Sequence, residues 1–286
     1  MSKVLITGAQ GFMGVRLAAY LKDRYEVLAC SHSDLDITDQ EEVLAFLRAH
    51  RPDVVVHCAA ISDTGYSQQH PEISLQVNVE GTVHLATACA EIGAKLVYMS
   101  SDQVYNGTAL LGGLPEDAPL SPNSVYGNHK LMAEERVGEL LPSAVGLRLT
   151  WMYDRLDSPY KLNRNLLFNL DQLTRSGQTM SVATREYRGI TWIWDVVRRI
   201  ESAWQLPGGI YNFGSENSLN SYETFLRAAQ LMHLESPELL IQKDEDRFPE
   251  HPRNLSMNIQ KLRQHGINFP DTLEGIAIAL QSDLCI

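Results

Sequence analysis

The first half of the chain alternates short apolar runs with longer segments that have helical periodicity. The apolar runs occupy residues 3–7, 25–30, 52–60, 94–100 and 144–153. Each run is continuously apolar, which is typical of strands whose two faces are both covered by helices. The alternation therefore predicts an α/β fold, namely a doubly wound parallel sheet of the Rossmann type.

The composition limits the classes of partner. The 286 residues carry a net charge of −11, which disfavours nucleic acid because its affinity rests on neutralising phosphates with lysine and arginine. The four cysteines show no metal-ligand spacing, so no metal site is predicted. The first apolar run leaves no room for a signal peptide before it, and no segment approaches the ~18 apolar residues of a membrane span. We therefore expect a cytoplasmic protein with no membrane or nucleic-acid partner.

A glycine-rich loop joins the first apolar run to the first helical segment. Gly8, Gly11 and Gly14 lie at three-residue spacing in VLITGAQGFMG. Glycines in this context let the backbone turn sharply and approach a pyrophosphate, and the helix N-terminus behind them supplies amide donors. A glycine-rich turn without a ligand is the alternative. The strand–loop–helix context favours binding of a nicotinamide dinucleotide.

The end of the second run bears on which nicotinamide cofactor binds. An acid there would bond the ribose 2′-hydroxyl of NAD, but this chain has Ser31, His32 and Ser33 before its first acid, Asp34. Hydroxyls and an imidazole can accept a 2′-phosphate that a carboxylate would repel, although no arginine is present to bind it. The sequence therefore favours NADP without excluding NAD. The loop that follows either covers the adenine or only caps a helix, and its candidate cofactor residues are Asp36 and Ile37.

Tyr126 and Lys130 in YGNHK are one helical turn apart and share a helix face. A nearby ammonium stabilises a phenolate, so Lys130 is expected to lower the pKa of Tyr126 from its usual ~10. Tyr126 would then exchange a proton with a carbonyl oxygen. A hydroxyl from another element must hold that oxygen, and Ser101 in SSDQVYNG is the candidate. A capped strand end with a turn at Asn106 and Gly107 is the structural alternative for this segment.

Several further stretches together resemble one family. In chain order they are DLDITD, RPDVVVHCAA, SSDQVYNG, EDAPLSPNSVYGNHKLMAEE, RLTWMY and HPRNLSMNIQKL. With the glycine loop, they are typical of the extended short-chain dehydrogenase/reductase superfamily. Within it, the chain resembles the dTDP-4-dehydrorhamnose reductase group of nucleotide-sugar reductases. The resemblance covers nearly the whole chain and implies an NAD(P)H-dependent reductase of a nucleotide-linked keto sugar.

The resemblance assigns roles to individual positions. It implies that Tyr126 donates the proton, that Lys130 also bonds the cofactor ribose, and that Ser101 polarises the keto oxygen. The expected cofactor-binding residues are Gly8, Gly11, Phe12, Met13, Gly14, Ser31, His32, Ser33, Asp36, Ile37, Cys58, Ala59, Ala60, Tyr126, Lys130 and Thr150. The expected substrate-binding residues are Ser101, Asp102, Gln103, Trp151, Asn165, Arg188, Arg253 and Asn254.

Departures from the group concern the substrate. Where the group usually has Val-Asp-Lys-Ala-Glu, this chain has TGYSQ at residues 64–68. Where the group usually has Arg-Pro near the C-terminus, this chain has His251-Pro252. The rhamnose precursor and another nucleotide-linked keto sugar therefore both stay open. Sugar-nucleotide dehydratases carry Asp-Glu after the Ser/Thr, whereas this chain has Asp102-Gln103. An amide cannot abstract a proton, so dehydratase activity is disfavoured.

The domain organisation follows from the same patterns. We predict a cofactor-binding domain over residues 1–153, rejoined by about 190–214, and a mainly substrate-binding portion over residues 154–286. The alternative function is a catalytically silent, cofactor-binding regulatory subunit, because the β subunit of methionine adenosyltransferase resembles the same group. The sequence leaves open which of the two functions applies and whether the protein forms a homodimer.

Overall fold

The computed structural model describes residues 2–282, which divide into two compact units. Unit 1 comprises the residues up to Val104 together with Pro122–Arg148 and Val197–Tyr211. Unit 2 comprises Tyr105–Ser121, Leu149–Val196 and the described residues from Asn212 onward. Residues 105–121 thus cluster with unit 2, although the sequence pattern placed them within residues 1–153.

Unit 1 is organised around a six-stranded sheet. Its strands are β1 (Lys3–Thr7), β2 (Glu26–Cys30), β3 (Val54–His57), β4 (Lys95–Ser101), β5 (Val145–Leu149) and β10 (Gly209–Phe213). Their order in the sheet is β10-β5-β4-β3-β1-β2. β1 pairs in parallel with both β2 and β3, and β3 pairs in parallel with β4. The chain leaves β1 toward β2 and then returns to β3 on the other side, so a topological switch point lies beside the end of β1.

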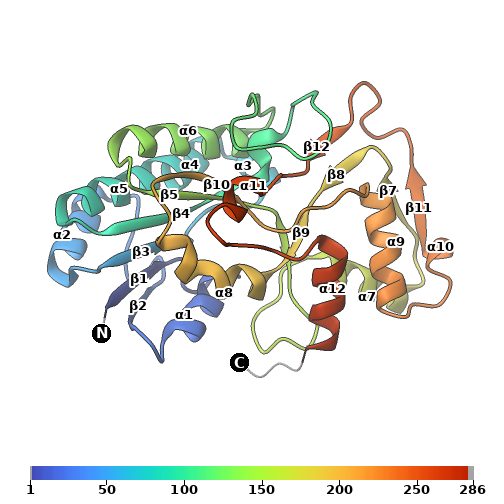
Figure 1. Ribbon diagram of the computed structural model, residues 1–286, viewed down its shortest axis with the longest axis horizontal. Coiled ribbons are helices and arrows are strands. Elements are labelled where there is room, and N and C mark those ends of the chain that lie inside the picture. Colours follow the sequence, from blue (N-terminus) through green and yellow to red (C-terminus); the bar gives the residue numbers. More distant parts are fainter. Residues whose placement is uncertain (1, 283–286) are drawn as a thin grey trace. The chain divides into compact units, whose positions relative to one another are not determined.

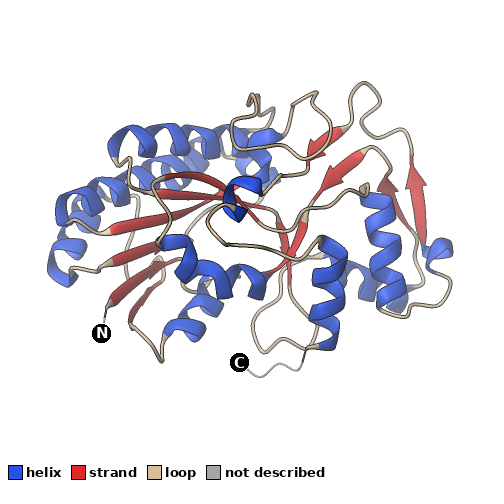
Figure 2. Ribbon diagram, in the orientation of Figure 1, coloured by secondary structure: helices blue, strands red, loops and turns tan. Residues whose placement is uncertain are grey.

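The helices of this unit lie on both faces of the sheet, which confirms the predicted α/β fold class (Figures 1 and 2). They are α1 (Gly14–Leu21), α2 (Gln40–His50), α3 (Thr64–Gln69), α4 (Pro71–Leu75), α5 (Gly81–Ile92), α6 (Val125–Leu140) and α8 (Ile193–Trp204), with a 3-10 turn at Asp102–Tyr105. Leu47 of α2, Val83 of α5 and Val137 of α6 share one apolar core with Leu5 and Leu96 of the sheet. Figure 1 shows α1 across the sheet from α5 and α6.

The helical pattern at residues 71–93 is not one continuous helix. A π-helical turn, Gln76–Glu80, separates α4 from α5. Asn78 lies in this turn with its side chain fully buried. Its amide oxygen accepts from the Ile61 backbone nitrogen at 2.9 Å, and its amide nitrogen donates to the Ile61 carbonyl at 3.0 Å. The turn thereby holds the segment that follows β3, and turns of this kind are frequent at functional sites.

Unit 2 contains three two-stranded parallel sheets, β6–β9, β7–β11 and β8–β12. Its strands are β6 (Trp151–Tyr153), β7 (Met180–Ala183), β8 (Glu186–Arg188), β9 (Ile190–Trp192), β11 (Ile241–Asp244) and β12 (Arg253–Leu255). Its helices are α7 (Leu166–Ser176), α9 (Ser221–Leu231), α10 (Pro237–Leu240), α11 (Gln260–Arg263) and α12 (Thr272–Gln281). Helix α8 follows β9 directly and begins at Ile193, because Thr191 and Trp192 complete β9.

A search of residues 2–282 for a membrane span finds no helix with both the length and the apolar character that crossing a bilayer requires.

Candidate active site

The glycine loop leads from β1 into α1 and packs against the end of β3. Gly8 has a φ of +66°, and a Cβ built on it would lie 2.6 Å from the Ala59 backbone nitrogen. A Cβ on Gly14 would lie 2.2 Å from the Gly8 carbonyl oxygen. Both positions therefore need glycine for close packing. Around a Cβ on Gly11, in contrast, only the Gly8 carbonyl oxygen lies within 4 Å, at 3.1 Å. The open side of the loop at Gly11 fits the pyrophosphate of a dinucleotide.

Two further loop residues, Phe12 and Met13, serve the packing of α1. Met13 is buried in the core. The Arg16 guanidinium lies 4.3 Å from the centre of the Phe12 ring and donates to the Phe12 carbonyl at 2.6 Å. Arg16 is fully buried and was not recognised from the sequence. The only sequence signal was its position two residues after Gly14.

The acid after β2 is committed to its own turn. The Asp34 carboxylate accepts from the Ser31 backbone nitrogen at 2.8 Å and from the Ser31 hydroxyl at 2.6 Å. The bonds from Ser31 lower the pKa of Asp34. The Ser33 hydroxyl lies 2.8 Å from that of Ser31, and the His32 side chain is 83% exposed. The end of β2 thus presents hydroxyls and an imidazole, while one oxygen of the Asp34 carboxylate, Oδ2, is bonded to Ser31.

Asp36 and Ile37 make contacts that the helix-capping alternative explains. Asp36 accepts from the backbone nitrogen of Thr38 at 2.9 Å and from its hydroxyl at 2.7 Å. Ile37 is buried, and its Cδ1 lies 2.8 Å from the position that a Cβ would take on Gly81. These local contacts favour a structural role, and the adenine-binding role of both residues stays a prediction.

A buried chain of polar groups supports the segment after β3, where the predicted cofactor residues Cys58, Ala59 and Ala60 are partly buried. The Thr7 hydroxyl lies 2.7 Å from His57 Nδ1 and 3.5 Å from the Ala59 nitrogen. His57 Nε2 lies 3.1 Å from the Thr82 hydroxyl. Burial lowers the pKa of His57 to about 3, so the ring is neutral. Sequence reasoning missed His57, although a histidine inside an apolar run was a usable signal.

The three predicted catalytic residues meet at the end of β4. Ser124 caps the first turn of α6 by accepting from the Gly127 nitrogen at 3.1 Å. A Cβ on Gly127 would lie 2.5 Å from the Gln103 carbonyl oxygen, so the helix approaches the end of β4 closely. The Ser101 side chain interacts with the Tyr126 hydroxyl and lowers its pKa. The Lys130 ammonium donates to the Met99 carbonyl at 2.9 Å.

The electrostatics of this group are dominated by burial, which outweighs the lowering of the Tyr126 pKa expected from Lys130. Burial raises the pKa of Tyr126 above its usual value, the bond with Ser101 lowers it, and the Asp102 carboxylate raises it. Burial also lowers the pKa of Lys130 to about 8. The Lys130 ammonium lies 5.7 Å from the centre of the tyrosine ring. Tyr126 is therefore a protonated phenol at neutral pH, which suits it to donate a proton to an oxygen that gains negative charge.

Asp102 and Gln103 lie at the same strand end and are buried. The Ser101 hydroxyl donates to Asp102 Oδ1 at 3.2 Å, and the Gln103 side chain donates to the same oxygen at 3.3 Å. The Asp102 carboxylate thus accepts hydrogen bonds from the side chains of both neighbouring residues. Gln103 has an amide where the dehydratases have a glutamate carboxylate, which agrees with the argument against a dehydratase.

In unit 2, three of the predicted substrate residues line one cavity of about 300 Å³. They are Trp151, Arg188 and Arg253. The Arg188 guanidinium lies 5.5 Å from the centre of the Trp151 ring. Arg253 forms an ion pair with Glu186 at 2.8 Å and donates to the Asn106 side chain at 3.1 Å. The cavity therefore combines an aromatic surface with three guanidinium groups, those of Arg188, Arg247 and Arg253, which suits a base and a phosphate group even beside the Glu186 carboxylate.

Asn165 and Thr150 are occupied by local structure. The Asn165 side chain is fully buried and caps α7, accepting from the Phe168 nitrogen at 3.1 Å. The Thr150 hydroxyl lies 2.5 Å from that of Thr191. These bonds explain both residues without a ligand. The role of Asn165 in substrate binding and that of Thr150 in cofactor binding stay predictions.

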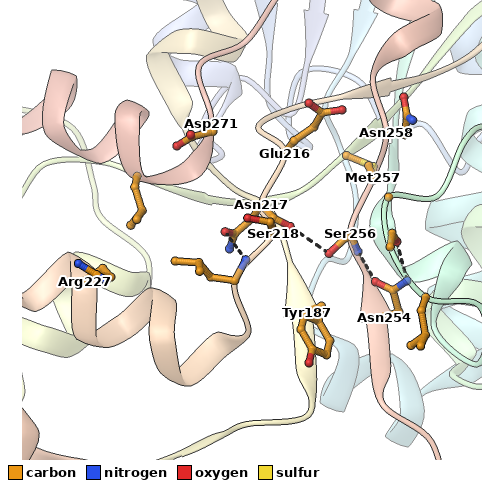
Figure 3. A pocket seen from close by; sticks show the side chains of 15 residues that line it. Tyr187, Glu216, Asn217, Ser218, Arg227, Asn254, Ser256, Met257, Asn258 and Asp271 are labelled. Carbon is orange, nitrogen blue, oxygen red and sulfur yellow. Dashed lines mark hydrogen bonds between the residues drawn. The ribbon is translucent and has the colours of Figure 1, made fainter.

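A larger cavity of about 940 Å³ in unit 2 was not expected from the sequence (Figure 3). Asn254 is on its wall, but its amide donates to the carbonyls of Leu110 and Gly112 at 2.9 and 2.8 Å. Its oxygen accepts from the Ser256 nitrogen at 3.0 Å, and Figure 3 shows the two residues side by side. Asn254 thus anchors the loop over residues 110–113, and its substrate role stays a prediction.

No cluster of three or more His, Cys, Asp or Glu side chains suited to a metal ion occurs within residues 2–282. Cys285, the last of the four cysteines, lies outside the described residues.

Comparison with known proteins places this geometry in a family. The model of the RmlD substrate binding domain family matches residues 2–283. A dTDP-4-dehydrorhamnose reductase of Streptomyces griseus is 35% identical over 218 residues, which are 73% of this chain and 69% of that protein. The methionine adenosyltransferase 2 subunit beta of Xenopus laevis is 29% identical over 280 residues, which are 93% of this chain and 83% of that protein.

A solved structure shows the same fold. The crystal structure of dTDP-4-dehydrorhamnose reductase from Bacillus anthracis in complex with NADP superposes with a TM-score of 0.86 and covers 98% of this chain and 99% of its own. Its sequence identity is 24%, so this likeness concerns the fold alone. The resemblance recognised in the sequence motifs is confirmed, and the chain belongs to the RmlD substrate binding domain family.

Proposed function

We propose that this protein is an NAD(P)H-dependent reductase of a nucleotide-linked keto sugar. The observation that carries the proposal is the meeting of Ser101, Tyr126 and Lys130 at the end of β4. Tyr126 interacts with Ser101 and holds its proton because burial raises its pKa, while Lys130 is fixed by the Met99 carbonyl. A hydroxyl pair beside a buried ammonium is suited to receive a carbonyl oxygen and to protonate it as it is reduced.

The chain's own residues have the following tasks in this reaction. Bound NAD(P)H would supply the hydride. Ser101 holds the keto oxygen by a hydrogen bond, in place of its present bond to Asp102. Tyr126 gives its proton to that oxygen as negative charge develops there. Lys130, whose pKa of about 8 leaves it mostly charged at neutral pH, stabilises the phenolate that Tyr126 becomes.

The cofactor proposal rests on the glycine loop and on the end of β2. The open side of the loop at Gly11 accommodates the pyrophosphate. The hydroxyls of Ser31 and Ser33 stand where an acid would be expected for NAD, and Asp34 is bonded to Ser31. We therefore propose NADPH as the preferred form, with NADH accepted less well.

The proposal for the substrate rests on the cavity formed by Trp151, Arg188 and Arg253 together with the names of the relatives. An aromatic ring and guanidinium groups recognise a nucleoside diphosphate through stacking and charge-assisted hydrogen bonds. The chain's departures at residues 64–68 and at His251 leave the sugar open between the rhamnose precursor and a related keto sugar.

The experiment that tests this function is an assay of NADPH oxidation with a panel of dTDP- and UDP-linked keto sugars. Turnover with one member of the panel, abolished in Tyr126→Phe, is the expected result. A protein that binds NADPH tightly but neither turns over nor binds any nucleoside diphosphate would contradict the proposal. That outcome would favour the regulatory-subunit alternative, which the Xenopus relative represents.

A further inference from the structure

Three side chains of α6 point at one strand end. Tyr126, Lys130 and Glu134 follow one another at four-residue spacing, so they share one face of the helix. Each is buried, and each contacts a different one of the last three residues of β4. The contacts are Tyr126 with the Ser101 hydroxyl, Lys130 with the Met99 carbonyl, and Glu134 with the Ser100 hydroxyl.

Glu134 also ties α6 to the neighbouring strand. Arg148 of β5 donates through Nε to Glu134 Oε1 at 2.9 Å and through Nη2 to Oε2 at 2.7 Å. The Ser100 hydroxyl donates to Oε1 at 2.5 Å. The side chains of Arg148 and Glu134 are only 3% and 4% exposed. One carboxylate thus joins the helix to two adjacent strands with three hydrogen bonds.

A buried ion pair of this kind is weak evidence for stability, because removing two charges from water offsets most of their attraction. Its bidentate geometry does fix orientation, since the planar guanidinium accepts the carboxylate in one arrangement. Glu134, the member of the pair on α6, lies one helical turn beyond Lys130 and two turns beyond Tyr126. Rotation or sliding of α6 relative to β4 would break it.

We propose that Glu134, held by Arg148 and Ser100, is a positioning residue that acts through Lys130 to place and charge the proton-transfer group at the end of β4. The proposal rests on the reductase function proposed above, and it adds a residue outside the predicted catalytic set. Glu134 touches neither a reacting atom nor a cofactor atom in this role.

Glu134 also affects the charge of Lys130. Burial lowers the pKa of Lys130 to about 8, the Glu134 carboxylate raises it, and the Cys58 thiol raises it further. His57 and Cys58, from the end of β3, and Tyr126 of α6 are the other titratable groups that interact with the ammonium. Burial keeps the His57 ring neutral and holds the pKa of the Cys58 thiol at about 12. Of these groups, only the Glu134 carboxylate carries a full negative charge. This charge therefore keeps Lys130 protonated near neutral pH.

The test uses Glu134→Gln in the full-length protein, with two comparison variants. Glu134→Gln keeps the shape of the side chain and removes its charge. Glu134→Leu/Arg148→Met replaces the pair by apolar groups of similar size, which protects folding if the single variant is unstable. The matched control is Arg136→Gln. It breaks a second bidentate ion pair of α6, which Arg136 forms with Glu80. The side chains of Arg136 and Glu80 are 41% and 35% exposed.

The first readout is independent of turnover. In protein labelled with ¹⁵N-lysine, the Lys130 ammonium signal is assigned from Lys130→Arg and followed against pH. We expect the titration midpoint to fall in Glu134→Gln, which leaves the Arg148 charge unpaired, to fall less in the double variant, which removes both charges, and to stay unchanged in Arg136→Gln. An unchanged midpoint in folded Glu134→Gln would overturn the proposal, whether or not the protein is a reductase.

The second readout is NADPH oxidation against pH. We expect turnover to fall ~10-fold or more in both Glu134 variants, because small displacements of a catalytic group have effects of this size, and its alkaline limb to move to lower pH. Wild-type turnover and pH profile in the double variant would show that the pair serves stability alone. Absence of turnover in the wild type itself would contradict the proposed function, while the lysine titration would still decide the role of Glu134.

Discussion

Lys130 donates to the carbonyl oxygen of Met99 at 2.9 Å, and that carbonyl belongs to the strand that also carries Ser101. The end of β4 therefore fixes both groups that lie near the Tyr126 side chain, the Ser101 hydroxyl and the Lys130 ammonium. Since Tyr126 and Lys130 lie on one helix and Ser101 on the strand, their arrangement depends on how closely α6 approaches β4. Gly127 allows this approach, because a Cβ there would lie 2.5 Å from the Gln103 carbonyl oxygen.

Tyr126→Phe is expected to reduce turnover by ~10²–10⁴-fold, the usual contribution of one general acid. The substitution removes only the Tyr126 hydroxyl, so NADPH should still bind. Single-turnover kinetics and cofactor fluorescence measure the two effects separately. Reduction of the substrate at the wild-type rate would show that Tyr126 is not the proton donor.

NADPH is expected to bind at least as tightly as NADH, because hydroxyls and an imidazole precede the first acid at the end of β2 and Asp34 already accepts two bonds from Ser31. Ser33→Asp should shift the preference toward NADH by repelling the 2′-phosphate. Ser33→Asn, which has a similar shape but no charge, is the control and should shift it much less. Fluorescence titrations with both cofactors measure the ratio. Tenfold tighter binding of NADH by the wild type would contradict the prediction.

Arg253→Ala is expected to weaken binding of dTDP or UDP by ~1.5–3 kcal/mol, the size of a hydrogen bond to a charged group. The reason is the position of Arg253 on the cavity that also contains Trp151 and Arg188. Arg227→Ala removes an arginine from the larger cavity instead and should have little effect. Calorimetry on the NADPH-loaded protein measures both. A larger loss for Arg227→Ala would move the nucleotide to the larger cavity.

Gly14→Ala is expected to destabilise the protein by ~1–3 kcal/mol or more, the usual cost of overpacking, because its Cβ would lie 2.2 Å from the Gly8 carbonyl oxygen. Gly138→Ala is the matched comparison. No atom lies within 4 Å of its Cβ position on α6, so it should stabilise by ~0.5–1 kcal/mol. Urea denaturation measures the free energy of unfolding of the wild type, Gly14→Ala and Gly138→Ala. Equal stability of Gly14→Ala and wild type would mean that the loop is not packed as described.

His57 is expected to make the protein less stable in acid. Its folded pKa of about 3 lies below its ordinary value of 6.5. The unfolded chain therefore takes up a proton as the pH falls through 6.5, while the folded protein does not until about pH 3. Stability should fall over this window by at most ~1.4 kcal/mol per pH unit from this group.

His57→Gln should flatten this part of the pH dependence, and the exposed His32→Gln serves as the control. Chemical denaturation at several pH values between 3 and 7 measures the slope. An identical slope in wild type and His57→Gln would assign the acid sensitivity to other groups.

The alternation of apolar runs and helical segments was sufficient to predict the α/β fold and most elements of unit 1. Such periodicity reflects which face of each element is buried, and residues close together in the sequence are enough to show it. The glycine loop was also recognisable, because its residue types are required by the backbone itself. The break at Gln76–Glu80 was not, since a π-turn changes the helix by a single residue and leaves the apolar pattern nearly intact.

The pairing of side chains depended on distances that the order of residues does not contain. Asn165 and Asn254 looked like ligand-binding amides, yet their partners are the first turn of α7 and the carbonyls of Leu110 and Gly112. The motif suggested that Lys130 lowers the pKa of Tyr126, but burial raises it more strongly than a single bond from Ser101 lowers it. Desolvation and ion pairing both arise from the packing of distant segments. The spacing of Glu134 from Lys130 was visible in the chain, but its union with Arg148 and Ser100 required α6, β4 and β5 to be folded together.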